Sequence, residues 1–158
     1  MAIAEIEACS GGGGALDSKC IPVMTAQSTP SGNATASSYA SNYPPYKAFS
    51  ADATGWYVTS AAFLNNWVKY EFDTAMVAHI FLGMAIANGA LKFSIYGSND
   101  DFASENDLLA SDVVVDTTTF YKPTFLNNSK AYKYYKFLVT ESNASSSCNG
   151  LKLQLIGA

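Results

Sequence analysis

The sequence predicts an all-β protein, a sandwich of two sheets built from about eight short strands. Runs of β-type residues are short, and Gly, Pro, Asn, Asp and Ser interrupt them along most of the chain. No apolar pattern with a helical period extends beyond about two turns. Charged residues make up 14% of the chain and aromatic residues 13%, which is typical of a β-domain with a polar but uncharged surface. Connections of variable length favour a sandwich over a barrel or a βαβ fold.

The side-chain pattern predicts each element in turn. Residues 33–38, rich in Ala, Thr and Ser, form the first expected strand. In 67–72, apolar residues at the even positions indicate one buried face, and the nearly continuous apolar run 77–87 indicates a strand covered on both faces. Leu at every second position of 151–156 again indicates one buried face. The other expected elements are strands over 91–97, 112–116 and 132–140, and a short helical turn over 104–110.

Residues 1–23 differ from the rest and form an expected N-terminal arm. Residues 1–8 are small and acidic, with Ile3 and Ile6 offering apolar contacts, and the glycines at 11–14 form a flexible tether. We therefore expect a docking arm over 1–23 and a sandwich domain over 24–158. We expect no secretory leader, because residues 1–8 lack a basic residue, and no membrane insertion, because the apolar run 76–87 is too short to cross a bilayer.

Three cysteines leave the redox state of the chain open. Cys20 precedes the first expected strand and Cys148 precedes the last, so a Cys20–Cys148 disulfide would join the two ends of the sandwich. Cys9 and Cys20 flank the glycine tether and form a second alternative pair. Three free thiols in a reducing cytosol are the third alternative.

The charged residues exclude several classes of function. All nine basic residues are Lys, and the net charge is −4. An acidic chain without Arg lacks the basic face of a nucleic-acid-binding protein and the planar fork that clamps phosphate or carboxylate. His79 is the single histidine, so a multi-His metal site is excluded, and no nucleophile or acid–base pair surrounds it in the sequence. We therefore expect a protein that is not an enzyme.

Five segments, in order along the chain, carry motifs of one domain family. They are Tyr-Pro-Pro-Tyr-Lys-Ala-Phe at 43–49 followed by Trp56, Trp-Val-Lys-Tyr-Glu-Phe at 67–72, Phe-Ser-Ile-Tyr-Gly-Ser-Asn-Asp at 93–100, Ala-Tyr-Lys-Tyr-Tyr-Lys-Phe at 131–137 and Leu-Lys-Leu-Gln-Leu-Ile-Gly at 151–157. Together they resemble the discoidin-like domains, also called coagulation factor 5/8 type C or galactose-binding-like domains. This family includes bacterial carbohydrate-binding modules and domains of bacteriophage tail and head-fibre proteins. The resemblance implies an eight-stranded jelly-roll sandwich with a ligand site in loops at one end.

The resemblance also concerns a structural Ca²⁺ ion. Family members often hold this ion with an Asp and a Glu, and the corresponding positions here are Ser50 and Lys152. A chain that loses two carboxylates and gains an ammonium group is a poor host for a divalent cation. Asp52 and Thr54 remain as weak candidate ligands. We therefore expect no cofactor and no bound Ca²⁺.

The loops between the expected strands contain the side chains that a sugar site needs. Flat aromatic rings pack against the C–H faces of a sugar, and amides or hydroxyls bind its hydroxyl groups. Phe49 and Trp56 are instead expected in the core, because large aromatic residues dominate cores. The candidate ligand contacts are Tyr39, Tyr43, Tyr57, Phe63, Asn65, Asn66, Asn88 and Asn143.

These expectations combine into two functional hypotheses of different classes. The first is a non-catalytic adhesion module displayed in many copies on a phage virion surface, extracellular once assembled, where it binds host-cell glycan through loops over 39–66. Residues 1–23 would anchor it to a virion structural protein. The second is a structural decoration or adaptor protein of a capsid or tail, with no ligand of its own. In both, nucleic acid is not a partner, and the weak charge favours a neutral glycan or a protein surface over an anionic partner.

Overall fold

In a computed structural model, the protein is a sandwich of two antiparallel sheets, described over residues 20–58, 63–85, 90–117, 122–142 and 150–157. The strands are β1 (Asn33–Ala36), β2 (Trp67–Met76), β3 (Ala78–Ala85), β4 (Leu91–Ser98), β5 (Asp107–Val115), β6 (Thr124–Phe125), β7 (Tyr132–Ser142) and β8 (Leu151–Gly157). A short 3-10 helix, η2 (Pro45–Phe49), lies between β1 and β2 in the chain. The expected all-β fold is confirmed. None of the described helices is long and apolar enough to span a membrane.

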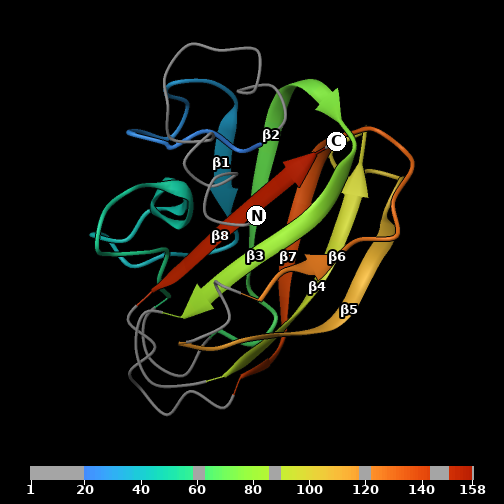
Figure 1. Ribbon diagram of the computed structural model, residues 1–158. Coiled ribbons are helices and arrows are strands. Elements are labelled where there is room, and N and C mark those ends of the chain that lie inside the picture. The colour runs from blue at the N-terminus through green and yellow to red at the C-terminus, as the bar shows by residue number, and fades with distance from the viewer. Residues whose placement is uncertain (1–19, 59–62, 86–89, 118–121, 143–149, 158) are drawn as a thin grey trace.

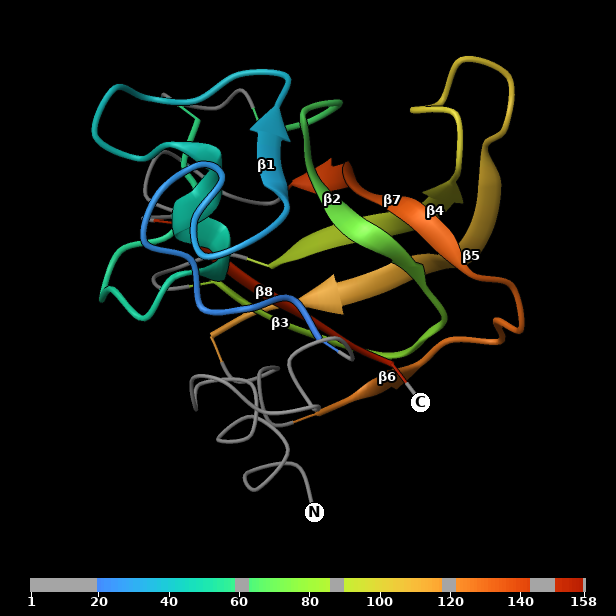
Figure 2. The same ribbon diagram turned by 90° about the horizontal axis from the view of Figure 1, so that it is seen from above.

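The strands divide into a five-stranded sheet in the order β1-β2-β7-β4-β5 and a three-stranded sheet in the order β6-β3-β8. In Figure 1, β8 and β3 cross in front of β7 and β4, and Figure 2 shows the two layers from above. Cys20 pairs with Ile156, and the Ile21 N–H donates to the Leu155 C=O at 3.2 Å. The last residues of the expected arm therefore lie along β8 as part of the sandwich.

Cys20 is buried and disulfide-bonded. The two other cysteines, Cys9 and Cys148, lie outside the described residues. The disulfide partner of Cys20 is therefore not described, and both the Cys20–Cys148 pair and the Cys9–Cys20 pair stay predictions.

The core lies between the two sheets and is rich in aromatic side chains. The even positions of β2 from Val68 to Phe72, and the three Leu residues of β8, are at most 6% exposed, which confirms the alternation seen in the sequence. Buried tyrosines place their hydroxyl groups on backbone atoms: Tyr70 donates to the Ser31 C=O at 2.8 Å, and Tyr135 accepts from the Ala78 N–H at 3.1 Å. Burial raises the pKa of Tyr70 well above its usual value.

Three elements differ from the sequence-based expectation. The helical turn expected over 104–110 is wrong, because Leu108 pairs with Tyr96 and Ala110 pairs with Ile95 in the register of β5 and β4. This pairing with a distant strand outweighs the local helical preference of Leu-Leu-Ala. The two-residue strand β6 and the helix η2 were not expected from the sequence. The helix begins at Pro45, where the fixed φ of proline suits the first turn of a helix.

Thr35 in β1 carries a buried hydroxyl with no hydrogen-bond partner among the described residues. An unsatisfied buried polar group costs about 1–3 kcal/mol, and Val has nearly the same shape without the hydroxyl. We expect Thr35→Val to raise the free energy of unfolding by about 1 kcal/mol in urea denaturation. Thr35→Ser, which keeps the hydroxyl and loses the methyl group, is the control and should give no gain. A Thr35→Val protein no more stable than wild type would contradict this interpretation.

Candidate functional site

The loops with the candidate ligand contacts meet at one end of the sandwich, where β1 ends and β2 and β8 begin. The Ser37 N–H donates to the Trp67 C=O at 3.0 Å. Trp56 and Leu151 exchange two backbone hydrogen bonds of 2.9 and 3.1 Å. We call this the apical end and define it by the described residues 37–44, 54–58 and 63–66.

Two further candidate residues belong to segments that leave strands at the same end. Ala85, the last residue of β3, pairs with Leu151, the first residue of β8. The segments with Asn88 and Asn143 follow β3 and precede β8, but both asparagines lie outside the described residues. Their contact with a ligand stays a prediction.

Four aromatic rings form a continuous chain from the apical surface into the core. The ring of Tyr57 lies edge to face with Tyr43 at 5.5 Å and with Phe63 at 5.6 Å, measured between centroids. Phe63 in turn lies edge to face with Trp56 at 5.8 Å. Trp56 is fully buried, Tyr43 and Tyr57 are half-buried, and Tyr39 is 51% exposed. The apical end therefore presents tyrosine rings on a rigid aromatic support.

Phe63 is a core residue and not a surface contact. It is only 3% exposed and packs against Trp56 and Tyr57. Its prediction as a ligand contact is wrong, because a loop phenylalanine that reaches two large rings gains more from burial than from exposure. Trp56 and Phe49 are confirmed as buried packing residues.

Hydrogen bonds hold the 38–43 loop to the aromatic chain. The Ala40 N–H donates to the Tyr57 C=O at 2.9 Å, and the indole N–H of Trp56 donates to the Ser38 C=O at 2.9 Å. Tyr39 lies between these two anchor points. Its exposed ring is therefore attached to a backbone held on both sides, as a binding residue requires.

Asn65 and Asn66 have different roles in the short turn before β2. Asn66 accepts a hydrogen bond from the Ser37 hydroxyl at 2.8 Å, so its side chain supports the loop. Asn65 is exposed, its φ is 64°, and its backbone N–H donates to the Val139 C=O at 2.9 Å. Asn tolerates this left-handed backbone better than most residues. Asn65 is thus the amide that this turn presents on the surface.

The base of the apical end requires glycine. A Cβ on Gly55 would lie 2.4 Å from the carbonyl oxygen of Leu151, closer than any side chain allows. Gly150 has a φ of 120° and its Cβ would meet the Gly55 backbone. These two glycines let the chain after β1 cross the start of β8 in direct backbone contact.

The oxygen atoms considered for a Ca²⁺ ion contact two lysine ammonium groups instead. Lys152 Nζ donates to the Ser50 C=O at 2.8 Å, to the Ser50 hydroxyl at 3.1 Å and to the Lys47 C=O at 3.0 Å. Lys47 Nζ donates to the Thr54 hydroxyl at 3.2 Å and lies 3.6 Å from an Asp52 carboxylate oxygen. Burial lowers the pKa of Lys152 to about 8, so this lysine is protonated at neutral pH. Two ammonium groups among these oxygens do not suit a divalent cation, which they would repel. Within the described residues, no three or more His, Cys, Asp or Glu side chains gather as metal ligands.

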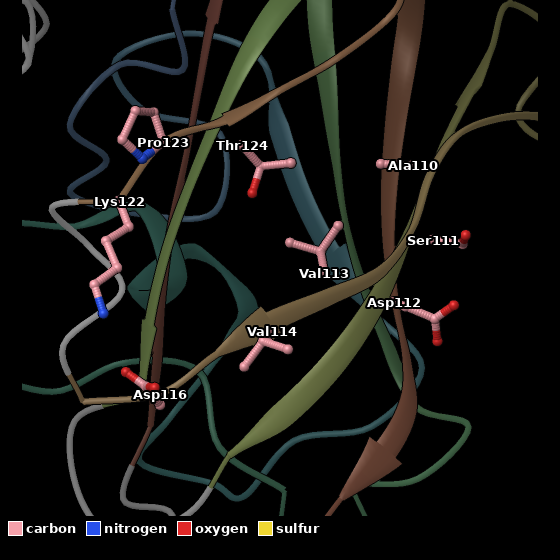
Figure 3. A pocket seen from close by; sticks show the side chains of 9 residues that line it. All are labelled: Ala110, Ser111, Asp112, Val113, Val114, Asp116, Lys122, Pro123 and Thr124. Carbon is pink, nitrogen blue, oxygen red and sulfur yellow. The ribbon is translucent and has the colours of Figure 1, made fainter.

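A groove of about 590 Å³ lies away from the apical loops, between β5 and β6, each the outermost strand of its sheet among the described residues. Figure 3 shows its two walls, which come from β5 and from the segment that leads into β6. The described lining residues include no aromatic ring. Exposed apolar side chains lie on the same strands: Val114 is 47% exposed, Leu108 56% and Phe125 75%. This groove lacks the ring platform of a sugar site and instead offers apolar surface beside free strand edges.

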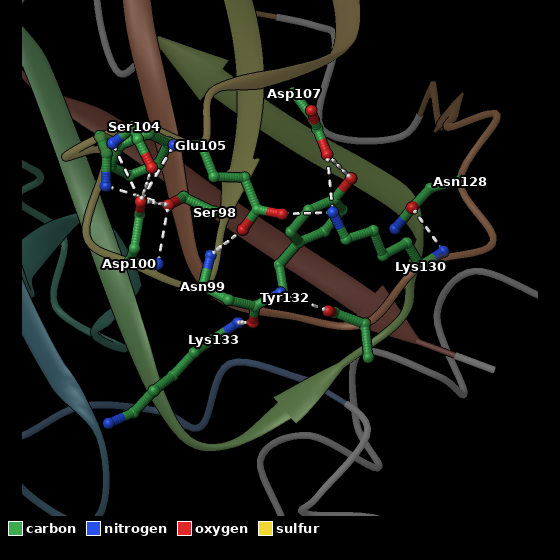
Figure 4. Close-up of polar contacts among 12 residues, drawn as sticks. Ser98, Asn99, Asp100, Ser104, Glu105, Asp107, Asn128, Lys130, Tyr132 and Lys133 are labelled. Carbon is green, nitrogen blue, oxygen red and sulfur yellow. Dashed lines mark hydrogen bonds and ion pairs between the residues drawn. The ribbon is translucent and has the colours of Figure 1, made fainter.

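The end of the sandwich opposite the apical end holds polar side chains that bind one another (Figure 4). Asp100 accepts hydrogen bonds from the Ser104 hydroxyl, from the Ser104 N–H at 2.9 Å and from the Ser98 hydroxyl at 2.9 Å. Nearby, Lys130 forms an ion pair with Glu105, and the Tyr132 hydroxyl donates a hydrogen bond to the Asp107 carboxylate on β5 at 2.6 Å. These polar groups are committed to the fold, which leaves the apical end as the better candidate for a ligand site.

The hydrogen bonds to the Asp100 carboxylate make the stability of the fold depend on pH in the acid range. The Ser104 hydroxyl, together with the other donors, holds the pKa of Asp100 well below its ordinary value of 3.8. As the pH falls below about 4, the unfolded chain takes up this proton before the folded protein does, so stability falls. We expect Asp100→Asn to be less stable than wild type at pH 7 and the difference to shrink between pH 4 and pH 2. Thermal unfolding across this range measures it, and a difference independent of pH would contradict the role of the carboxylate.

No protein-family model and no curated protein matches the sequence. Solved structures match the fold. A pectin-binding carbohydrate-binding module aligns at 22% identity and a TM-score of 0.59, over 79% of this chain and 88% of that chain. The family 32 carbohydrate-binding module of Clostridium perfringens NanJ, in complex with galactose, aligns at 14% and 0.60, over 78% and 92%. Chitosan-binding module 1 from a chitosanase/glucanase of Paenibacillus sp. IK-5 aligns at 14% and 0.59, over 80% and 95%. The chain therefore has the discoidin-like, galactose-binding-like β-sandwich fold of these modules.

Proposed function

We propose that the protein is a non-catalytic carbohydrate-binding module whose apical end binds sugar. The observation that carries the proposal is the exposed ring of Tyr39, on a loop held by hydrogen bonds at Ser38 and Ala40. The Tyr43–Tyr57 ring pair and the exposed Asn65 lie at the same end of the sandwich. Rings and amides are the groups that recognise the faces and hydroxyls of a sugar. Structures of the same fold are described as pectin-binding, as chitosan-binding and as a complex with galactose, which supports sugar as the ligand class.

The position of Cys20, the first described residue, supports display of this module on a larger assembly, which we propose to be a phage virion surface. Cys20 pairs with Ile156, at the far end of β8 from the apical Leu151. An arm over residues 1–19 therefore joins the sandwich at the end opposite the sugar site. Anchoring by this arm to a virion structural protein leaves the apical end facing a host cell. Many displayed copies would turn a weak single-site affinity into firm attachment.

Binding of the intact protein to a glycan array tests this function. The array should include galactosides, pectin fragments and chitosan oligosaccharides, and the protein should be presented both as a monomer and in multivalent form. We expect signals on a restricted set of glycans, strengthened by multivalent presentation. No signal in either form would contradict the proposal.

The groove between β5 and β6 favours a second candidate function, a structural decoration or adaptor protein. Exposed Val114 and Phe125 flank free strand edges there, and such edges are common sites of contact between chains. Deletion of residues 1–19 separates the two functions while keeping the buried Ile21. Both functions predict that this deletion weakens incorporation into particles, so glycan binding is the readout that separates them. A sugar-binding module would keep its glycan after the deletion, whereas an adaptor would show no glycan binding before or after it.

A further inference from the structure

The ammonium group of Lys152 lies at a point where oxygen atoms of the 47–50 turn converge. Its three N–H donors face three oxygens: the carbonyls of Lys47 and Ser50 and the Ser50 hydroxyl, all 2.8–3.1 Å away. Within the described part of the chain, no carboxylate lies within 4.0 Å of this nitrogen. A partly buried cation is thus held by neutral carbonyl and hydroxyl oxygens, and hard metal ions also prefer oxygen ligands.

The contacted carbonyls belong to the C-terminal end of a helix. Lys47 lies in η2, and Ser50 is its C-cap residue. The Lys47 C=O also accepts hydrogen bonds from the Ser50 N–H at 3.5 Å and from the Ser50 hydroxyl at 3.2 Å, and a cation beside the last carbonyls of a helix is favourable. Lys152 lies on β8, so its ammonium group satisfies these carbonyls and joins η2 to the three-stranded sheet. Figure 2 shows η2 beside β8, in agreement with their direct contact.

Lys47 completes the arrangement with the other oxygens of the same turn. Its ammonium group contacts the Thr54 hydroxyl and the Asp52 carboxylate, the two side chains left as ligands for a metal. Both candidate ligands, Asp52 and Thr54, therefore contact a lysine of the chain itself. A divalent ion could enter only by displacing or repelling two positive charges.

We propose that the Lys152 ammonium group replaces a structural divalent cation, fastening the 47–54 turn to β8 without a metal, and that a carboxylate at position 152 would convert this turn into a Ca²⁺ site. The inference concerns the support of the fold and is independent of whether the apical end binds sugar. It makes the wild-type protein indifferent to Ca²⁺ and chelators. A single substitution, at position 152, would then make the stability of the fold depend on Ca²⁺.

Thermal unfolding of the full chain, with excess Ca²⁺ or with a chelator, tests the proposal in three proteins. Wild type should unfold at the same temperature in both conditions. Lys152→Glu should unfold at a lower temperature than wild type in chelator and regain several degrees on addition of Ca²⁺, as expected for about 1 kcal/mol or more of ligand-linked stabilisation. Lys152→Gln, the matched control, removes the cation without adding a carboxylate and should not respond to Ca²⁺.

Two results would overturn the proposal. One is an equal response of Lys152→Glu and Lys152→Gln to Ca²⁺. The other is saturable Ca²⁺ binding to wild type, measured by calorimetry, that Asp52→Asn abolishes. The second measurement does not require a Lys152 variant to fold. A Ca²⁺ response of Lys152→Glu that Asp52→Asn weakens would support the assignment of the turn as the site.

Discussion

Trp56→Ala is expected to lower the free energy of unfolding by about 3–5 kcal/mol, a large fraction of the stability of a typical domain. Trp56 is fully buried, its ring packs edge to face against Phe63, and its indole N–H donates to the Ser38 C=O. Removing the ring leaves a cavity and an unsatisfied carbonyl at the base of the apical end. Equilibrium denaturation in urea, followed by circular dichroism, measures the loss.

Phe125→Ala is the control for this measurement, because Phe125 is an aromatic residue that is 75% exposed. It should change the free energy of unfolding by no more than about 0.5 kcal/mol. If Trp56→Ala were as mild as Phe125→Ala, the ring of Trp56 would not be the support of the apical loops.

Tyr39→Ala is expected to weaken sugar binding at least tenfold, a loss of about 1.4 kcal/mol of binding free energy, while leaving stability nearly unchanged. The ring is 51% exposed and its backbone is held by neighbouring hydrogen bonds, so its removal affects the surface and not the core. Titration of an array-selected oligosaccharide against wild type and variant measures the change. Phe125→Ala again serves as the control and should bind like wild type.

Asn65→Gly gives an independent variant of the same site. Its backbone has a φ of 64°, which glycine adopts without strain, so this change removes the amide and keeps the turn. We expect weaker sugar binding with little loss of stability. Phe63→Ala should differ from both, because a residue that is 3% exposed affects binding only through the loss of stability. Wild-type affinity in both Tyr39→Ala and Asn65→Gly would exclude the apical end as the sugar site.

The fold could be predicted largely from the sequence, because local side-chain patterns indicate most of its strands. Alternation in β2 and β8 indicated their buried faces, and ordered motifs indicated the sandwich. The start of β5 was not predictable in this way, because Leu108 pairs with Tyr96 on another strand and the local sequence favours a helix. The segment 44–49 does contain a local signal for η2, because the proline pair Pro44-Pro45 stands at its start.

The candidate site was predictable in its location and less so in its individual residues. Tyr39, Tyr43 and Tyr57 do gather at one end of the sandwich with Asn65. The burial of Phe63 depends on its contact with Trp56, which no local pattern contains. The sequence indicated the loss of acidic ligands at Ser50 and Lys152. The sequence could not show that the Lys152 ammonium group binds the carbonyls of the 47–50 turn. This contact forms only because β8 packs beside η2 in the folded protein.

The most direct test of sugar binding at the apical end is a nuclear magnetic resonance titration of the labelled intact protein with an array-selected oligosaccharide. We expect saturable shifts of the backbone amides of Tyr39, Ala40 and Asn65, and unchanged amides in the groove around Val114. Shifts confined to that groove, or no shift with any oligosaccharide, would contradict a carbohydrate-binding apical end.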